Sequence, residues 1–268
     1  MAQIDRNRVR RAFSEKADNY DAQALVQQRV VDRFLERNFA AGDAPATVLD
    51  VGAGTGRLLA SLMVRFPSVF AVGLDMAHGM ARSAARRLPS GNSAVLCGDG
   101  EHLPFSDGCF DMVVSTSTYQ WLNPLENAFS EAWRVLRPGG RFLFALFGEA
   151  TLFELKESYR QALRLQGGGV DRTHQFVSRI EALKALENAG FKWSRVDSER
   201  EVELHADVPS LLKSLKGIGA ANASALPARG LAGRRVTTAM IDLYGTVYGV
   251  EAGIPATYEV LYGEGVRV

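Results

Sequence analysis

The sequence is poor in cysteine and histidine and has almost no net charge. Its 268 residues carry a formal net charge of +1, so no excess of positive charge indicates nucleic acid as a partner. The two cysteines, Cys97 and Cys109, are too few and too poorly spaced for a disulfide framework or a zinc site, and the four histidines show no metal-ligand spacing. We therefore expect no metal site, no nucleic-acid partner, and a reducing compartment, the cytoplasm.

A long hydrophobic run is also missing. The most apolar window, RFLFALFGEATLFEL (residues 141–155), is interrupted by Gly148 and Glu149 and is too short to span a bilayer. The stretch MAQIDRNRVRRAF at the start has no apolar core of the kind that a secretory signal contains. We expect no targeting segment and no membrane partner.

The chain does contain an alternation of short apolar runs and helical stretches. Runs at residues 47–51, 69–75, 94–99, 111–117 and 141–147 predict strands, and the amphipathic stretches between most of them predict helices. This order is typical of a parallel sheet with helices on both faces, and strands that are apolar throughout fit a sheet that is covered on both sides. The predicted fold class is therefore α/β.

The flanking segments follow other patterns. Residues 22–39 have helical spacing, and RPGG at 137–140 predicts a turn. After Gly148 the sequence predicts two helices, a strand at 192–204, a helix-rich segment, and a last alternating strand, TYEVLYGEGV.

A glycine-rich loop follows the first predicted strand, in the stretch VLDVGAGTGRLL. Its three glycines, Gly52, Gly54 and Gly56, can take positive φ angles and let a ligand approach the backbone closely. A dinucleotide site would need a glycine at position 57, which is Arg57. Asp50 lies two residues before the first glycine, where a carboxylate suits an amine and would repel a pyrophosphate.

Two further carboxylates follow the next strands. Asp75 ends the second predicted strand, where it can accept hydrogen bonds from a ribose diol, and Asp99 follows the third, where it can accept from an exocyclic amine. A capping or solvated carboxylate is the alternative for Asp99. Strand ends of a parallel sheet meet at one crevice, so these groups converge on a ligand with an amino acid, a ribose and an adenine. That ligand is S-adenosylmethionine.

Ordered motifs between residues 45 and 148 resemble those of class I S-adenosylmethionine-dependent methyltransferases. They read VLDVGAGTG, VGLDMA, GDGEHLPFSDGCFDMVVS and VLRPGGRFLFA. The resemblance implies a Rossmann-like, seven-stranded, mostly parallel sheet whose last strand inserts antiparallel. It also implies the product S-adenosylhomocysteine and a cofactor site made of Asp50, Gly52, Gly54, Gly56, Asp75, Met76, Asp99, Gly100 and Ser115.

The same resemblance suggests a division of the chain into four parts. We expect an N-terminal helical lid at 1–42, a methyltransferase core at 43–204, a helical cap insertion at 205–250 and a final strand of the core sheet at 251–268.

The segments outside the core motifs resemble one subfamily, the malonyl-acyl carrier protein (ACP) O-methyltransferases of biotin synthesis. The matching stretches are RAFSEKADNYDAQALVQ, STSTYQWLNPLENAFSEAWRVLRPGG, FGEATLFELKESY, LLKSLKGIGAANAS and YGVEAGIPATYEVLYG. The resemblance implies methylation of the free carboxyl of a malonyl thioester, with ACP as the partner.

The implied chemistry needs no general base, because a malonyl carboxylate is already ionised at pH 7. Catalysis can rest on positioning and on removal of water, and our candidates at the mouth of the site are Tyr20, Gln120 and Trp121. The alternative is C- or O-methylation of a small apolar molecule such as a quinone precursor, where a carbon nucleophile would need a base such as His174 or Glu149. A regulator that binds S-adenosylmethionine without turnover is the non-enzyme alternative.

The segment from residue 204 to 241 is locally basic. It contains five basic residues and one acid, Asp207, which gives 5 − 1 = +4. We expect Lys213, Lys216 and Arg229 in this segment to steer an acidic ACP. The sequence does not give the oligomeric state, and we favour a monomer.

Overall fold

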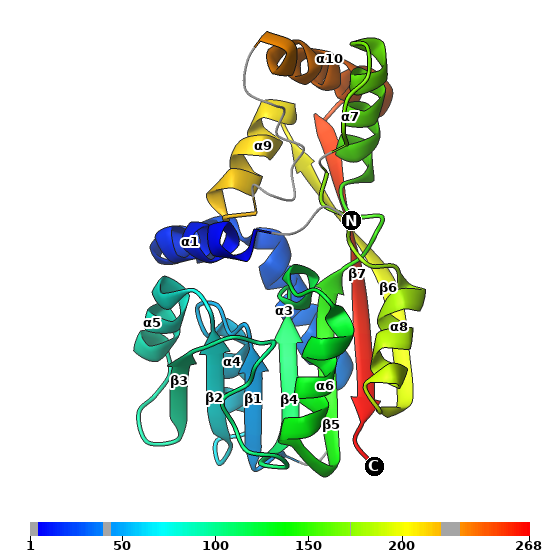
Figure 1. The fold of residues 1–268 in the computed structure, drawn as a ribbon. Helices are drawn as coiled ribbons and strands as arrows, with labels where there is room; N and C mark the ends of the chain where they lie inside the picture. The colour runs from blue at the N-terminus through cyan, green and yellow to red at the C-terminus, as the bar shows by residue number, and fades with distance from the viewer. Residues whose placement is uncertain (1–4, 40–43, 172, 221–230) are drawn as a thin grey trace.

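The computed structural model describes residues 5–39, 44–171, 173–220 and 231–268, and gives no side-chain description for residues 231 and 232. Seven strands in these residues form one sheet in the order β3-β2-β1-β4-β5-β7-β6 (Figure 1). Their bounds are β1 Thr47–Val51, β2 Phe70–Asp75, β3 Ser93–Cys97, β4 Phe110–Thr116, β5 Leu136–Phe147, β6 Lys192–His205 and β7 Ile254–Val266.

Strands β1 to β5 pair in parallel, whereas β7 lies antiparallel between β5 and β6. The predicted seven-stranded sheet with an inserted antiparallel last strand is thus confirmed. The predicted turn at RPGG lies inside β5: the register with β4 jumps from Leu136 to Arg141, and Gly139 has a φ of 81°.

Helices cover both faces of the sheet. On one face α3 (Leu25–Asn38) and α4 (Arg57–Arg65) bury side chains such as Phe34 and Leu59, and on the other α6 (Leu125–Val135) and α8 (Arg179–Asn188) bury Phe129 and Leu186. The helix α5 (His78–Arg87) packs on β2 and β3. Where both faces are covered, in β1, β2, β4 and β5, the strands are mostly apolar, as the sequence indicates. The edge strand β6 is instead polar and largely exposed.

The N-terminal segment contains more helix than its polar composition suggests. Helix α1 (Arg6–Lys16) begins at Asp5, whose side chain accepts a hydrogen bond from the N–H of Arg8 (3.0 Å). A 3₁₀ turn (Ala17–Asn19) and α2 (Tyr20–Gln23) follow, so the helix expected from residue 22 is divided before α3. Helix α1 crosses above α5 (Figure 1), and their contact requires Gly79, since a Cβ there would lie 2.2 Å from the carbonyl oxygen of Ser14.

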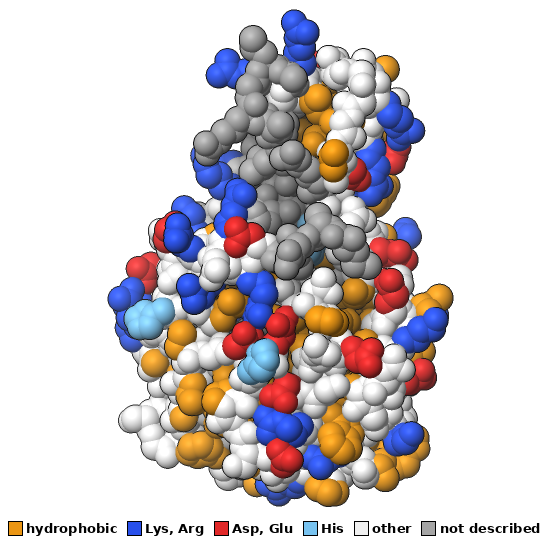
Figure 2. Space-filling model, in the orientation of Figure 1, with side chains coloured by type: hydrophobic (Ala, Val, Ile, Leu, Met, Phe, Trp, Pro, Cys, Tyr) orange, Lys and Arg blue, Asp and Glu red, His pale blue; other side chains and the backbone are white. Residues whose placement is uncertain are grey.

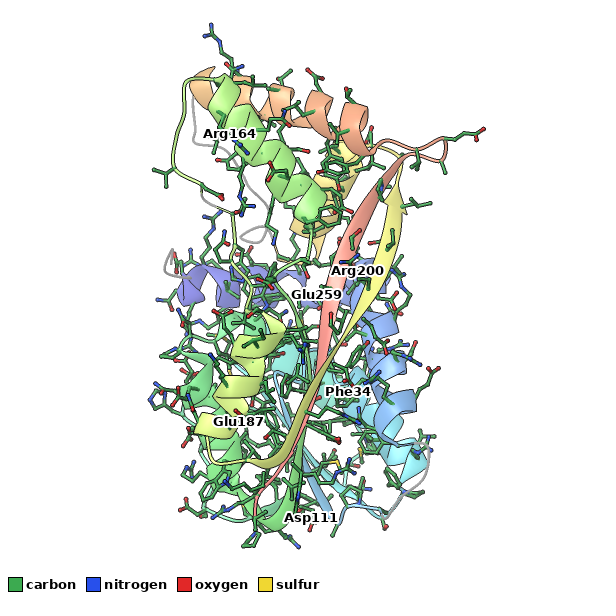
Figure 3. All side chains as sticks on the ribbon, turned by 90° about the vertical axis from the view of Figure 1, so that its right-hand side faces the viewer. Phe34, Asp111, Arg164, Glu187, Arg200 and Glu259 are labelled. Carbon is green, nitrogen blue, oxygen red and sulfur yellow. The ribbon has the colours of Figure 1, made fainter. Side chains whose placement is uncertain are left out.

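Three helices stand above the carboxyl ends of the strands: α7 (Phe153–Leu165), α9 (Val208–Gly217) and α10 (Leu231–Tyr248) (Figure 1). Strands β6 and β7 run side by side from the core up to this layer (Figure 3). Tyr159 of α7 and Met240 and Tyr244 of α10 are buried in the same core cluster. Helix α7 therefore lies with the helices of the expected cap, although the sequence division assigned it to the core.

In the described part of the chain, no helix is long and apolar enough to cross a membrane.

Candidate functional site

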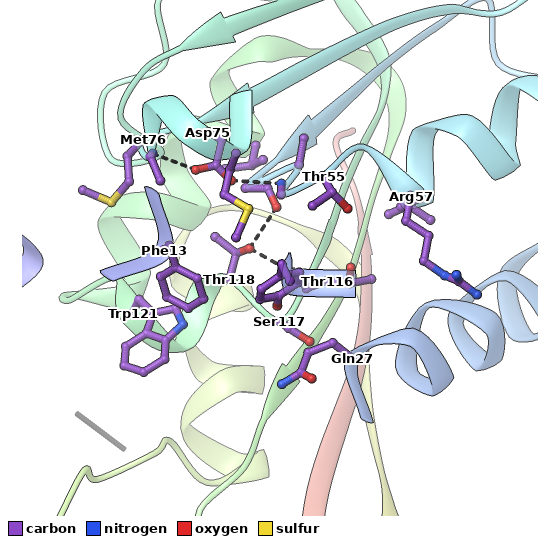
Figure 4. Close-up of a pocket in the computed structure, with 18 of the residues that line it drawn as sticks. Phe13, Gln27, Thr55, Arg57, Asp75, Met76, Thr116, Ser117, Thr118 and Trp121 are labelled. Atoms are coloured by element: carbon purple, nitrogen blue, oxygen red, sulfur yellow. Dashed lines mark hydrogen bonds between the residues drawn. The ribbon is translucent and has the colours of Figure 1, made fainter. Parts of the chain in front are cut away.

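A cavity of about 1000 Å³ lies at the carboxyl ends of β1, β2 and β4, beneath α1, α2 and α3 (Figure 4). Its floor is the glycine-rich loop, and its walls include Met76, Gly100 and the segment Thr116–Thr118 after β4. We call it the first cavity. Its place at the carboxyl ends of the strands is typical of ligand sites in α/β proteins.

The three glycines of the loop have positive φ angles but different surroundings. A Cβ on Gly52 (φ 78°) would lie 2.1 Å from the Thr118 hydroxyl, and one on Gly56 (φ 81°) would lie 3.1 Å from Ala84 of α5. A Cβ on Gly54 (φ 55°) would meet nothing within 4 Å. Gly52 and Gly54 line the first cavity, whereas Gly56 lets α4 pack closely on α5.

Two predicted carboxylates lie under this loop. Asp75 lines the first cavity and accepts hydrogen bonds from the N–H of Gly54 (2.9 Å) and of Ala77 (2.7 Å). Asp50 does not line it: the side chain is buried behind the loop, and its Oδ1 atom has no hydrogen-bond partner. Burial raises the pKa of Asp75 to about 6, and burial together with the charge of Asp75 raises the pKa of Asp50 to about 8.

The structure places two other predicted cofactor residues away from the first cavity. The Asp99 carboxylate forms an ion pair with Arg6 of α1 (2.5 Å) and does not line the cavity. The buried Ser115 hydroxyl donates to the carbonyl oxygen of Val51 (2.6 Å) and ties β4 to β1. Arg6 also pairs with Glu101 (2.7 Å), so the loop after β3 holds the N-terminal helix in place.

The N-terminal helices close over the first cavity through polar contacts with the core. Asp21 of α2 accepts a hydrogen bond from the Thr55 hydroxyl (2.7 Å) and pairs with Arg87 of α5. Burial alone would raise the pKa of Asp21, but the hydrogen bonds from Arg87 and Thr55 outweigh it and lower the pKa. The N–H of Gly79 donates to the Ser14 hydroxyl (2.9 Å). These contacts hold α1 and α2, which belong to the expected lid, over the first cavity.

A second cavity, of about 430 Å³, adjoins the first and reaches towards α9. The two cavities share five lining residues: Phe13, Tyr20, Gln27, Ser117 and Trp121. Thus Tyr20 and Trp121, both predicted, stand where the cavities meet.

The remaining wall of the second cavity is mostly apolar. Leu215 and Ile218 from the end of α9, together with Phe176, supply part of it. Gln120, the third predicted residue, lines only this cavity: its Nε2 donates to the carbonyl oxygen of Ser117 (2.7 Å), and its buried Oε1 has no partner. Among the described residues that line this cavity there is no Asp, Glu, His, Lys or Arg.

Comparison with known proteins shows which family this chain belongs to. A family model described as "Methyltransferase domain" matches residues 49–144. The malonyl-[acyl-carrier protein] O-methyltransferase of Geobacter sulfurreducens is 53% identical over 266 residues, which are 98% of this chain and 100% of that protein. The chain belongs to the malonyl-ACP O-methyltransferase family. The enzyme of the same name from Laribacter hongkongensis is 36% identical and covers 98% of this chain and 90% of its own length.

A solved structure supports the fold of this malonyl-ACP O-methyltransferase family member. The YcgJ protein from Bacillus subtilis superposes with a TM-score of 0.60 at 20% identity, covering 90% of this chain and 98% of that one. At that identity the likeness shows the fold alone and does not indicate the methyl acceptor.

Two titratable side chains lie behind the second cavity of this family member and do not line it. His174 is buried, its ring centroid is 5.1 Å from that of Trp121, and burial lowers its pKa to about 4. Lys156 is buried as well and donates to the carbonyl oxygen of Glu149 (2.6 Å), and burial lowers its pKa to about 8. Neither side chain lines either cavity.

The basic residues predicted to meet a partner are only partly described. Lys213 and Lys216 are exposed on α9, and no ion pair joins either to a carboxylate in the described part of the chain. Arg229 lies outside the described residues.

Proposed function

We propose that this chain transfers a methyl group from S-adenosylmethionine to the free carboxylate of malonyl-ACP and so forms the methyl ester. Relatives named malonyl-[acyl-carrier protein] O-methyltransferase match it along nearly its whole length. The first cavity would hold the methyl donor and the second the malonyl group, because the five shared residues give the two ligands a common boundary.

We choose a carboxylate oxygen as the methyl acceptor because the described lining of the second cavity has no charged side chain. Its described residues supply no group that could act as a base near pH 7, since its tyrosines have raised pKa values. A carboxylate needs no base, and an apolar wall removes water from it before the reaction. A carbon acceptor would need a base, and the two candidates do not serve: His174 lies behind the wall, and Glu149 is exposed.

The first cavity fits S-adenosylmethionine on three counts. Gly54 leaves open space at the loop, and Asp75 keeps acceptor capacity for a ribose. Asp50, which is buried with an orphaned Oδ1, would ionise when a cationic ligand binds and would then stabilise that ligand. S-adenosylmethionine supplies a methyl group on a positively charged sulfur, which an oxygen nucleophile can take without a covalent enzyme intermediate. We assign Met76 and Gly100 to the same ligand, and we give Asp99 and Ser115 structural roles instead.

We also propose that the chain is divided into a lid, a core and a cap, and that α7 belongs to the cap. Helix α1 of the lid and the end of α9 pack on each other: Val9 shares a buried cluster with Ile218 and Ala220. Both cysteines are free thiols, which supports the cytoplasm as the compartment.

A basic face at the mouth of the site would receive the carrier protein. It consists of exposed side chains on α1 and α9, namely Arg8, Arg10, Arg11, Lys213 and Lys216. Figure 2 shows several Lys and Arg side chains on this side of the molecule, near the level of α1. Arg10 also lines the first cavity, so the basic face reaches the site itself. An acidic ACP would be steered by complementary charge.

The test is transfer of labelled methyl groups to malonyl-ACP, malonyl-CoA and free malonate. We expect the highest kcat/KM with malonyl-ACP, and a fall of that value with rising salt. The double variant Lys213→Glu/Lys216→Glu should raise KM for malonyl-ACP and leave malonyl-CoA unchanged, whereas Lys184→Glu on α8 is the control for charge reversal elsewhere. Equal kinetics with both thioesters would contradict the role of the basic face.

A further inference from the structure

One residue at the boundary of the two cavities, Ser117, has a backbone that only glycine adopts readily. Its φ is 56°, in the left-handed region, which is strained for serine but not for glycine. Backbone strain of this kind concentrates at functional sites, where the surrounding structure maintains it. The strain at Ser117 is therefore a reason to ask what its side chain contacts.

The Ser117 hydroxyl has no hydrogen-bond partner, although it is buried. Two nearby hydroxyls are used within the protein: that of Ser115 donates to the carbonyl oxygen of Val51 (2.6 Å) and that of Thr118 to the carbonyl oxygen of Gly52 (3.2 Å). Buried hydroxyls are normally paired, so an orphaned one that lines a cavity points to a ligand.

The backbone of Ser117 is held on both sides. Its N–H donates to the carbonyl oxygen of Ala145 (2.8 Å), and its own carbonyl oxygen accepts from Gln120 Nε2 (2.7 Å). The hydroxyl thus stands on a fixed support, as a positioning group requires. Gln120, predicted as an acceptor-site residue, also acts by holding Ser117.

The location of Ser117 selects the acceptor as the ligand. Figure 4 shows Ser117 and Gln27 at the same end of the first cavity, away from Asp75. Ser117 also lines the second cavity, whose described lining contains no charged side chain. A neutral hydroxyl can hold a carboxylate through a charge-assisted hydrogen bond without forming an ion pair that would reduce its nucleophilicity.

We propose that the Ser117 hydroxyl donates a hydrogen bond to one carboxylate oxygen of the malonyl group and so positions the other oxygen as the nucleophile at the boundary between the cavities. This inference rests on the function proposed above and names the group that holds its acceptor.

Two variants separate the hydroxyl from the backbone strain. Ser117→Ala removes the hydroxyl and keeps the strain, whereas Ser117→Gly removes both and should fold at least as stably as the parent chain. We expect each to lower kcat/KM for malonyl-ACP by about 10- to 100-fold, the range for loss of a hydrogen bond to a charged group. The dissociation constant for S-adenosylmethionine, measured by titration calorimetry, should stay within about twofold of the parent value.

The control for strain relief is Trp193→Gly. Trp193 also has a left-handed φ (48°), but it is 75% exposed and lies on β6, away from both cavities. This variant should leave methyl transfer unchanged. Parent-like kcat/KM in Ser117→Gly would overturn the inference, and so would a loss that lies wholly in donor affinity. A parent chain that transfers no methyl group to malonyl-ACP would instead overturn the proposed function itself.

Discussion

Replacing Asp50 by asparagine should stabilise the ligand-free fold at neutral pH and weaken binding of the methyl donor. Asp50 is 2% exposed, its Oδ1 has no partner, and burial and the nearby Asp75 raise its pKa to about 8. In the unfolded chain the same carboxyl ionises at its ordinary pKa. Ionisation at pH 7 therefore favours the unfolded state, and the variant removes this effect.

The size of the effect follows from the two pKa values. Between pH 3.8, which is the model-peptide pKa, and pH 7, the free energy of unfolding falls by about 1.4 kcal/mol per pH unit, or about 4 kcal/mol in total. The favourable contribution of protonated Asp50 is present in full below the unfolded pKa and is lost as the pH rises towards 8. Asp50→Asn should thus raise the free energy of unfolding by about 4 kcal/mol at pH 7 and by only about 1.5 kcal/mol at pH 5.

Urea unfolding at the two pH values measures this difference, with Asp242→Asn on the exposed surface of α10 as the control. Titration calorimetry with S-adenosylmethionine measures the second effect: the positive charges of the donor favour ionised Asp50, so the variant should bind it more weakly. Equal stability changes at pH 5 and pH 7, or unchanged donor affinity, would refute the reasoning.

Three further predictions concern the loop, the lid and the acceptor side. Gly52→Ala should lower the free energy of unfolding by about 2–5 kcal/mol, because an alanine in the left-handed conformation would also collide with Thr118. Gly54→Ala should lower it by only about 1–2 kcal/mol and should mainly weaken donor binding. Equal losses of stability in urea unfolding would contradict the geometry. Asp21→Asn breaks the lid's ion pair and should speed donor dissociation about two- to fivefold in stopped-flow experiments, and an unchanged rate would show that the lid opens by another route. At saturating substrates kcat should change less than about twofold between pH 6 and 7.5, since His174 stays neutral there; a steep rise would instead indicate a titrating base.

The parallel part of the sheet, β1 to β5, could be predicted because these strands are short apolar runs that alternate with amphipathic helical stretches. The loop after β1 could be predicted to have an unusual backbone, because Gly52 and Gly54 lie between a strand and a helix; both have positive φ and line the first cavity. Helix α1 was harder to place: its buried side comprises little more than Val9 and Phe13, and the rest of its sequence reads as solvated and basic.

The cofactor roles of Asp99 and Ser115 could not be judged from the sequence. Asp99 is bound by Arg6, which is distant in sequence and was brought close only by folding of the lid. In β4, alternate side chains point to opposite faces, so a shift of one residue decides whether Ser115 or Thr116 faces the ligand. A role for Ser117 could not be predicted from the sequence, because a serine does not indicate the positive φ that the backbone has at this position.

The most direct test of the central claim is the chemical nature of the product. Malonyl-ACP would be incubated with the chain and S-adenosylmethionine labelled in the methyl group, and the labelled thioester treated with mild alkali. Carboxyl O-methylation predicts that the label is released as methanol, because a methyl ester hydrolyses under these conditions. Label that stays on the acyl carbon chain would contradict the account and indicate C-methylation.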